Sequence, residues 1–383
     1  MRDVSIIGIG QTDVNEQWGM SLRQLALEAS RAALSDSHLD HVDALFVGNM
    51  LAGELNGQNN LGALIADVVG LRGIEAITVE AAAASGAAAL RQAYLAVAGG
   101  LLDCALVVGV EKMSDISGGG AISAQLTGTD SEYEAVHGVT PLSIAAMLMR
   151  RYMHEYDAAL ADFAAFSINA HFNAKTNPHA MFHNQLSVDS FTKAPMVADP
   201  INLFDAAAAA DGAAAIVITP TESLRVKNGA VRIAGSAAAT DALALAERRD
   251  PLWLSAAEAS AQRAYQRAGV DATQIDFAEL HDEATVLAAL SLEACGFTER
   301  GAGVNFAKSG AVARNGKVPI STMGGLKGRG HPGGATGVYQ IVEAVLQLRG
   351  CAGANQIPDA HVALTQSLGA NGAVAVTHIL TRD

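Results

Sequence analysis

The chain repeats one pattern of strand, turn, helix and strand, and this repeat limits the folds open to it. In the first copy, an apolar run at 77–79 leads into an alanine-rich turn at 81–89. A helix-like stretch at 90–98 follows, and a second apolar strand at 105–108 comes after a pair of glycines. Short apolar runs beside stretches of helical periodicity predict alternating strands and helices.

The second copy has the same elements in the same order. A run at 318–320 leads into a glycine-rich turn around His331, followed by a helix-like stretch at 338–348 and an apolar strand at 362–365. Chance similarity among segments rich in Ala, Gly and Val is the alternative explanation. Because the elements agree in order, we favour a duplicated α/β unit.

Residues 116–200 have a different texture and are interpreted as a lobe inserted into the first half. Helical periodicity predicts helices at 141–156 and 158–174, and glycines and prolines mark the ends of the lobe. We therefore divide the chain into an N-terminal half at 1–220, which contains the insertion, and a C-terminal half at 221–383. The expected fold class is α/β.

Composition limits the environment of the protein. Of the 383 residues, 50% are hydrophobic and only 17% are charged, which suits a large core of closely packed helices and sheets. A net charge of −14 argues against non-specific binding to nucleic acid. The chain begins with a strand-like run instead of a signal-peptide layout and lacks an apolar stretch of about 18 residues. We expect a soluble, cytoplasmic protein that does not insert into membranes.

The end of the first apolar strand is a place suited to nucleophilic chemistry. A side chain at the start of a helix meets unpaired backbone N–H groups and the positive end of the helix dipole. These groups lower the pKa of a thiol and stabilise an oxyanion. Ala83 occupies this position and cannot act as a nucleophile. The structural alternative is a small residue that fits a tight strand–helix junction.

Two histidines are candidates for acid–base chemistry. His331 lies in a turn whose glycines leave its imidazole little steric cover, so it can act as a general base or donate to an oxyanion. A tight or phosphate-binding turn is the alternative. His281 has Asp282 and Glu283 beside it, and helix capping is the alternative role of Asp282. Because no third ligand can be named and the three cysteines are scattered, no metal site is expected.

Taken together, these segments resemble the thiolase superfamily, in particular the archaeal and sterol-carrier-type thiolases, over essentially the whole chain. The specific part is Gly-His-Pro-Gly-Gly-Ala-Thr-Gly at 330–337 with the Gly-Gly pair before it. The supporting segments are 79–86, 109–114, 205–215, 279–282 and 366–372. The resemblance implies a duplicated αβαβα five-layer fold with an inserted loop domain, assembled as a dimer or tetramer.

The resemblance also implies roles for particular residues. His331 would match the histidine that activates the nucleophilic cysteine and helps to bind the thioester oxygen. His281 would complete this oxyanion site. Gly369 and Gly372 would lie in the loop that lines a second oxyanion site. Coenzyme A or acyl-CoA would be the substrate, held by the inserted lobe, and no covalently bound cofactor is expected.

The chain departs from the family pattern at the reacting positions. Ala83 stands where the family has its acyl-accepting cysteine, and without a thiolate no covalent acyl-enzyme can form. Glu283 occupies the place of the acid–base cysteine of sterol-carrier-type members, and Gln366 the place that others use. Glu283 is therefore a candidate acid–base group if burial raises its pKa. Ala284 and Ser321 also replace an aromatic residue and an asparagine. An engineered substitution and natural divergence both explain Ala83.

Three functions follow from these departures. The favoured one is a thiolase-type acyl-CoA C-acyltransferase of lipid metabolism, which condenses acyl-CoA or cleaves a 3-oxoacyl-CoA such as acetoacetyl-CoA, and which is inactive or altered with Ala83. The second is a thiolase-like aldolase that needs no cysteine and splits acyl-CoA substrates by a retro-aldol reaction. The third is a non-catalytic acyl-CoA-binding scaffold. Some members of the superfamily assemble with a small zinc-ribbon/OB-fold acyl-CoA-binding protein, which makes such a partner an expectation here.

Overall fold

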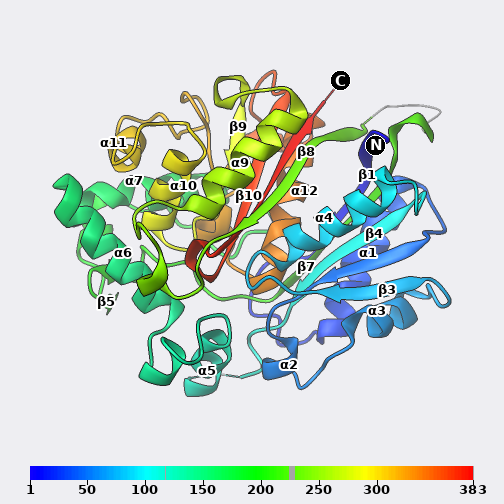
Figure 1. The fold of residues 1–383 in the computed structure, drawn as a ribbon, viewed down its shortest axis with the longest axis horizontal. Helices are drawn as coiled ribbons and strands as arrows, with labels where there is room; N and C mark the ends of the chain where they lie inside the picture. The colour runs from blue at the N-terminus through cyan, green and yellow to red at the C-terminus, as the bar shows by residue number, and fades with distance from the viewer. Residues whose placement is uncertain (117, 224–228, 383) are drawn as a thin grey trace.

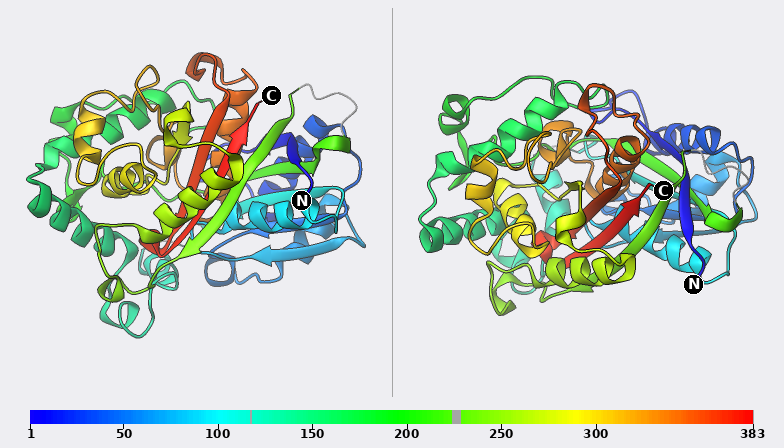
Figure 2. Two further views of the ribbon diagram at one scale, coloured as in Figure 1. Left: turned by 45° about the horizontal axis from the view of Figure 1, so that its top comes forward. Right: turned by 90° about the horizontal axis from the view of Figure 1, so that it is seen from above.

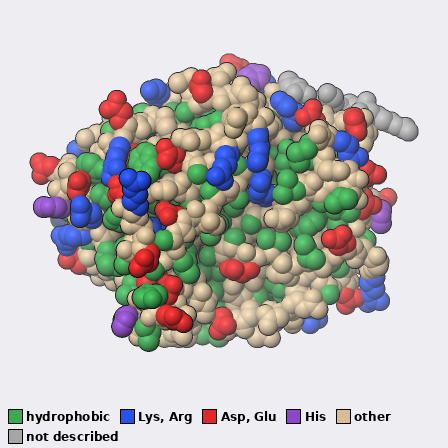
Figure 3. Space-filling view, viewed as in Figure 1, with side chains coloured by type: hydrophobic (Ala, Val, Ile, Leu, Met, Phe, Trp, Pro, Cys, Tyr) green, Lys and Arg blue, Asp and Glu red, His purple; other side chains and the backbone are tan. Residues whose placement is uncertain are grey.

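The computed structural model describes residues 1–116, 118–223 and 229–382. Its strands join in one nine-stranded sheet, and a separate pair of short strands lies in the inserted segment. Within the described residues, no helix has the length and apolar character that crossing a membrane requires. Figure 3 shows that Lys and Arg side chains are interspersed with Asp and Glu on one face of the molecule, without a field of a single sign.

The strands of the N-terminal half occupy one side of the sheet (Figure 1). In spatial order these strands are β3 (Glu75–Val79), β2 (Ala44–Gly48), β4 (Ala105–Glu111), β7 (Gly212–Pro220) and β1 (Val4–Gln11). β2 runs parallel to β3 and β4, whereas β7 is antiparallel to its neighbours β4 and β1. β7 lies beyond the inserted segment in sequence, so the chain returns to the first half after the insertion.

Counted outward from the middle of the sheet, the strands of the C-terminal half repeat the order of the first half: the first strand of the half, then its last strand, then the strand before that. Its strands, in spatial order, are β8 (Val231–Thr240), β11 (Val374–Thr381), β10 (Val362–Gly369) and β9 (Phe277–Glu279). A single parallel bridge between Ala278 and Ile320 stands where the fifth strand would lie, so the strand predicted at 318–320 is reduced to one bridging residue. The two halves meet through a short antiparallel contact between β1 and β8. The topology therefore supports duplication.

Two helices form a central layer between the halves. α4 (Ser85–Ala98) packs on β2 and β4, and α12 (Thr336–Leu348) packs both on α4 and on strands of each half. Nearly every residue of α12 is buried, although an outer helix would bury only one face. α1 (Leu22–Ser37) covers the first half, and α9 (Ser255–Ala268) covers β8 and β11 (Figure 2). The strands of the two halves therefore form two sheet layers on either side of α4 and α12. This helix–sheet–helix–sheet–helix order confirms the predicted fold class.

The inserted segment folds mainly into helices that rest on the C-terminal half. The prediction at 141–156 is confirmed by α6 (Pro141–Tyr156), which begins at a Thr140 cap with proline in the first turn. The stretch predicted at 158–174 is divided into a 3₁₀ turn and α7 (Ala164–Ala174). α6 packs on α10, and α7 packs on the π-helical turn at 325–329. The remaining short elements are α2 (Ala52–Leu55), α3 (Leu61–Val69), α5 (Gly119–Leu126), α8 (Val188–Thr192), β5 (Met196–Ala198), β6 (Ile201–Asn202), α10 (Thr285–Ala294) and α11 (Gly303–Lys308).

Candidate active site

A small pocket lies where the two halves and the inserted segment meet. Its volume is about 40 Å³, and its lining includes Ala83, Glu283, His331, Ala370 and Asn371. These residues come from four segments that are far apart in the sequence. Three of the predicted site residues are therefore brought into one pocket.

The turn that carries Ala83 keeps a strained backbone although it has no nucleophile. Ala82 has φ 49°, in the left-handed region that costs a residue with a Cβ roughly 1–2 kcal/mol. Ser85, the first residue of α4, closes the turn, because its hydroxyl accepts from Ala81 N at 2.9 Å and donates to Ala82 O at 2.6 Å. Ala83 is 6% exposed and borders the pocket. The methyl group thus occupies the junction that sequence analysis assigned to a nucleophile.

Close contact between two glycines brings the turn of Ala83 against the turn of His331. A Cβ on Gly86 would lie 2.8 Å from Gly334 O and 2.9 Å from a methyl group of Val338. Neither the carbonyl nor the packed valine can move away, so only glycine fits this crossing. The first turn of α4 and the approach to α12 are held together here, which sets the two candidate groups beside one pocket.

His331 is held on both its backbone and its ring. Its N–H donates to Ala208 O at 2.9 Å, and its carbonyl accepts from Ala210 N at 3.1 Å. The ring atom Nδ1 lies 2.7 Å from Thr336 Oγ1, so this hydroxyl determines which way the imidazole presents its Nε2 atom. Burial lowers the pKa of His331 to about 4, which makes the imidazole neutral near pH 7.

Glu283 lies between the two histidines. Its Oε2 is 3.4 Å from His281 Nε2, and its Oε1 is 3.9 Å from His331 Nε2. The rings of His281 and His331 are perpendicular, with centroids 5.6 Å apart. Burial raises the pKa of Glu283, but the hydrogen bond from His281 and the two imidazoles outweigh it and lower that pKa to about 2. The raised pKa on which its acid–base role was expected to depend is therefore not found, and Glu283 is a carboxylate whose side chain is one-third exposed to the pocket.

His281 lies behind this carboxylate. Its side chain is 1% exposed, it does not line the pocket, and Nδ1 has no hydrogen-bond partner within the described part of the chain. It reaches the pocket through Glu283. Together these three side chains are also the one group of His, Cys, Asp and Glu in the described residues that is compact enough to hold a metal ion, with ligand atoms all within 4.8 Å. Sequence analysis did not anticipate this because it found no third ligand.

Asp282 does not cap the helix that follows it. The cap position of α10 is Ala284, whereas Asp282 is buried and accepts from Leu326 N at 2.7 Å and from Ser321 Oγ at 3.0 Å. The capping role considered as the alternative for Asp282 is therefore wrong. Its carboxylate instead fixes the segment of His281 and Glu283 to the turn at 325–329, which leads to the second histidine.

The predicted oxyanion glycines flank the pocket instead of lining it. Ala370 and Asn371, between them, line it and have φ 49° and 50°. Gly369 has no room for a side chain, because a Cβ would lie 2.4 Å from Ala81 O, next to the turn of Ala83. Gly372 has φ 92° and completes the turn. The loop itself is therefore at the site, and the lining role passes to its two central residues.

Two buried charged residues that sequence analysis missed hold the walls of the pocket. The carboxylate of Glu111 accepts from four N–H groups at 2.8–3.0 Å, which join two walls of the pocket; the donors are Asn49 Nδ2, Met50 N, Leu51 N and Gly334 N. Arg248 donates to Ala370 O at 2.9 Å and to Asn371 O at 2.7 Å. Both residues bond groups far away in sequence, so no local pattern could have marked them.

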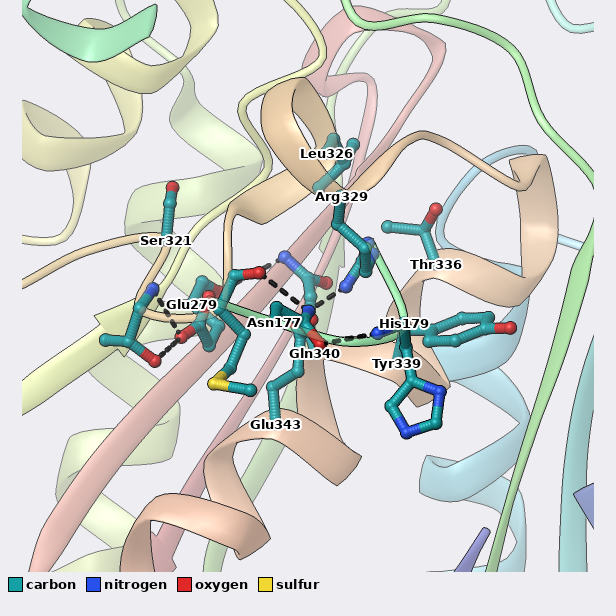
Figure 4. A network of polar contacts seen from close by, with 12 residues as sticks. Asn177, His179, Glu279, Ser321, Leu326, Arg329, Thr336, Tyr339, Gln340 and Glu343 are labelled. Carbon is teal, nitrogen blue, oxygen red and sulfur yellow. Dashed lines mark hydrogen bonds and ion pairs between the residues drawn. The ribbon is translucent and has the colours of Figure 1, made fainter. Parts of the chain in front are cut away.

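A buried polar network supports the segments of both histidines (Figure 4). Arg329 pairs with Glu343 at 2.7 Å, and Gln340 donates to Glu279 O at 3.2 Å. Burial and the nearby Glu343 raise the pKa of Glu279 well above its usual range. Glu279 and Arg329 each stand two residues before a histidine of the site. The network therefore fixes the spacing between the two segments.

This duplicated five-layer fold, in which His331 and Glu283 share a pocket with the strand–helix turn of Ala83 and His281 lies behind Glu283, defines a thiolase-like α/β enzyme. The chain belongs to the thiolase family: residues 4–222 match the family described as "Thiolase, N-terminal domain", and residues 237–382 match "Thiolase C-terminal domain-like". The recognition made from sequence is confirmed, and the family places the chain among acyltransferase enzymes.

Similar proteins include both transferases and an aldolase. The chain is 40% identical to "Acetyl-CoA acetyltransferase" of Methanothermobacter thermautotrophicus over 100% of both chains. It is 30% identical to "Sterol carrier protein 2" of Homo sapiens, across 98% of this chain and 72% of that protein. The solved structure "Ltp2-ChsH2(DUF35) aldolase" superimposes with a TM-score of 0.88 at 26% identity, covering 100% of this chain and 98% of the other.

Proposed function

We propose that the chain acts on acyl-CoA, makes or breaks a carbon–carbon bond next to the thioester carbonyl, and does so without a covalent acyl-enzyme. One observation carries this proposal. The pocket is lined both by Glu283, whose carboxylate lies between two imidazoles, and by Ala83, which presents only a methyl group. A carboxylate and imidazoles can move protons and stabilise an oxyanion, but a methyl group cannot accept an acyl group.

A retro-aldol cleavage of a 3-hydroxyacyl-CoA fits these groups. Glu283 takes the proton of the β-hydroxyl group, the bond between Cα and Cβ breaks, and an aldehyde or ketone leaves. The electron pair of that bond forms the enolate of the thioester, whose oxygen accepts from His331 Nε2–H when the Thr336 hydroxyl donates to Nδ1. Glu283 then returns the proton to Cα, which yields the shortened acyl-CoA. The reaction balances without a further reactant.

The comparisons support both this chemistry and a second candidate. A protein named as an aldolase shares the fold at 26% identity, which favours C–C cleavage on this scaffold. The relative at 40% identity is named as an acetyl-CoA acetyltransferase, which favours thiolase-type acyl transfer. Acyl transfer through a covalent intermediate needs a thiol at position 83. Acyl transfer is therefore the function expected of a chain with cysteine at position 83, and the aldolase reaction is the function expected of the chain with Ala83.

The test offers the purified chain two substrates in parallel. With 3-hydroxyacyl-CoA we expect an aldehyde or ketone and a shortened acyl-CoA, both followed by mass spectrometry. With acetoacetyl-CoA and coenzyme A we expect no thiolysis. Glu283→Gln keeps the shape of the side chain and should slow cleavage by about 10²-fold or more, the usual contribution of a general base. Thiolysis by the unaltered chain, or cleavage that survives Glu283→Gln, would overturn the mechanism.

Assembly and location complete the proposal. The aldolase neighbour carries a DUF35 protein in its name, which supports a small acyl-CoA-binding partner for this chain. We also keep the expectation of a homodimer or tetramer in the cytoplasm, with two halves that divide near residue 220. Light scattering of the purified chain, alone and with a candidate partner, tests the assembly. If the chain is strictly monomeric and binds no partner, the proposed assembly is wrong, whereas the proposed retro-aldol reaction is unaffected.

A further inference from the structure

The candidate active site has the composition of a metal-ion site. It contains two imidazole nitrogens and one carboxylate, a donor set found in zinc and other transition-metal enzymes. The ligand atoms of His281, Glu283 and His331 all lie within 4.8 Å of one another. The three side chains come from two segments that the buried network of Arg329 and Glu343 fixes in place, so the grouping does not depend on a mobile surface loop.

The distances come near to those that a small ion requires. In a tetrahedral zinc site with bonds of about 2.0–2.1 Å, neighbouring ligand atoms stand roughly 3.3 Å apart. His281 Nε2 and Glu283 Oε2 are already 3.4 Å apart, and His331 Nε2 is 3.9 Å from Glu283 Oε1. These two distances involve different carboxylate oxygens, and closing separations of up to 4.8 Å requires shifts of roughly 1.5 Å shared among the three side chains.

The surroundings of the ligands suit metal binding as well. Thr336 Oγ1 lies 2.7 Å from His331 Nδ1, and when this hydroxyl accepts from Nδ1–H, the lone pair of Nε2 is left for an ion. Glu283 is one-third exposed, so the site has an open side toward the pocket. The small methyl group of Ala83 borders this side and leaves it unobstructed. A site with three protein ligands and an open side is the pattern of zinc that can also bind a small ligand.

We propose that one divalent transition-metal ion, with zinc preferred, binds to His281, Glu283 and His331. While it is bound, the ion prevents these residues from catalysing the retro-aldol reaction. The donor set selects against Mg²⁺ and Ca²⁺, which prefer oxygen ligands. The inhibitory consequence rests on the proposed function. A bound ion takes the carboxylate oxygen that would accept the substrate proton and the imidazole lone pair whose tautomer would otherwise carry Nε2–H. The same three residues therefore cannot hold the ion and perform the retro-aldol step together.

Metal binding is measured first, in the absence of substrate. The chain, with Cys351→Ser to remove an exposed thiol, is freed of metal by chelation and titrated calorimetrically with Zn²⁺. Co²⁺ absorption then reports the ligand field. We expect one site per chain, a higher melting temperature with Zn²⁺, and no such effect with Mg²⁺. Glu283→Gln and His281→Asn should each weaken zinc binding by at least about tenfold.

Two further variants separate ligation from general surface binding. Thr336→Val removes the hydroxyl beside His331 and should weaken binding by about 10- to 100-fold, whereas Thr336→Ser keeps the oxygen and should restore it. His179→Gln alters a half-buried histidine outside the three ligands that pairs with Asp13 at 2.7 Å, and it should leave zinc binding unchanged. Unfolding curves without metal confirm that each variant is folded.

The outcomes distinguish this inference from the proposed function. Absence of a stoichiometric zinc site, or equal binding by Glu283→Gln, overturns the metal site and leaves the retro-aldol proposal intact. If the chain binds zinc but cleaves no acyl-CoA, the metal site is supported and its proposed inhibitory role is overturned. Where cleavage is found, Zn²⁺ should abolish it and a chelator should restore it. Cleavage that instead increases with Zn²⁺ overturns the inhibitory role.

Discussion

Arg329 Nη1 lies 2.7 Å from Glu343 Oε2, and the two side chains are 0% and 1% exposed. This ion pair joins the turn of His331 to α12. Neutralising one partner strands the other charge in the core, so Glu343→Gln should destabilise the fold by about 3–5 kcal/mol. Arg329→Met combined with Glu343→Leu should cost less than the sum of the two single changes. Urea unfolding of the parent chain, Arg329→Met, Glu343→Leu and the double variant measures this coupling.

An exposed ion pair serves as the control for this cycle. Lys193 and Asp189 are 2.8 Å apart, with side chains 74% and 73% exposed. Asp189→Asn should change the free energy of unfolding by less than about 1 kcal/mol, as exposed pairs do. Equal losses at the buried and the exposed pair would contradict the role given to the buried network.

Restoring a thiol at position 83 should create a reactive group. Ala83→Cys places it after the strained turn and before the first turn of α4, where backbone N–H groups favour a thiolate. We expect the pKa of the new thiol to lie below the ordinary value of about 8.5 and acetoacetyl-CoA thiolysis to appear. The rate of alkylation as a function of pH measures the pKa of the thiol, and an assay with acetoacetyl-CoA and coenzyme A measures thiolysis.

The native thiols provide the background for this measurement. Burial raises the pKa of Cys104 to about 12 and also raises that of Cys295, so neither should react near neutral pH. Cys351 is exposed and is replaced by serine in both chains. If the thiol at position 83 alkylates no faster than a small-molecule thiol and gives no thiolysis, the junction does not activate a nucleophile.

Loss of the guanidinium of Arg248 should loosen the loop at the pocket. Arg248→Met removes the donors to Ala370 O and Asn371 O, whose residues have positive φ and need external support. We expect a loss of about 2 kcal/mol or more in stability and faster amide exchange at 370–372. Hydrogen-exchange mass spectrometry checks this. Arg249→Met alters the exposed neighbouring arginine and should change neither quantity.

The contribution of two buried histidines to stability should fall as pH decreases from about 6.5 to 4. Burial lowers the pKa of His378 to about 4, and that of His171 likewise. The unfolded chain titrates these groups near 6.5, so within this window it binds more protons than the folded chain. Each histidine should reduce stability by up to about 1.4 kcal/mol per pH unit. Buried carboxyl groups whose pKa burial raises act in the opposite direction, among them Glu111, raised to about 7, and Asp205, raised to about 6.

A single variant isolates one term of this pH dependence. His378→Gln removes the titrating ring, so its melting temperature should depend less steeply on pH between 6.5 and 4 than that of the parent chain. His361→Gln changes an exposed histidine and should leave the slope as it was. Comparing slopes avoids the separate cost of the lost contact between His378 Nε2 and Ala87 O. Parallel curves for parent and His378→Gln would disprove the assignment.

The sequence determined the layers of the fold and the histidines of the site. Periodicity and end signals are local, and for this reason α6 begins and ends at the predicted residues, Pro141 and Tyr156. The repeated order of strands and helices likewise foretold two similar halves. The turn containing His331 was conspicuous because its glycines are needed where backbones cross, as at Gly86 and Gly334.

Only the tertiary structure decided which groups meet. Asp282 is adjacent to a helix in sequence, yet its carboxylate bonds Leu326 and Ser321, and Arg248 bonds carbonyls more than a hundred residues away. Such partners are selected by packing of the whole core, because a buried charge is stable only where distant donors and acceptors converge on it. Likewise, the sequence placed Glu283 two positions from His281. Its place between both imidazoles was set by the hydrogen bond from Leu326 N to Asp282, which joins its segment to that of His331 and which no local pattern contains.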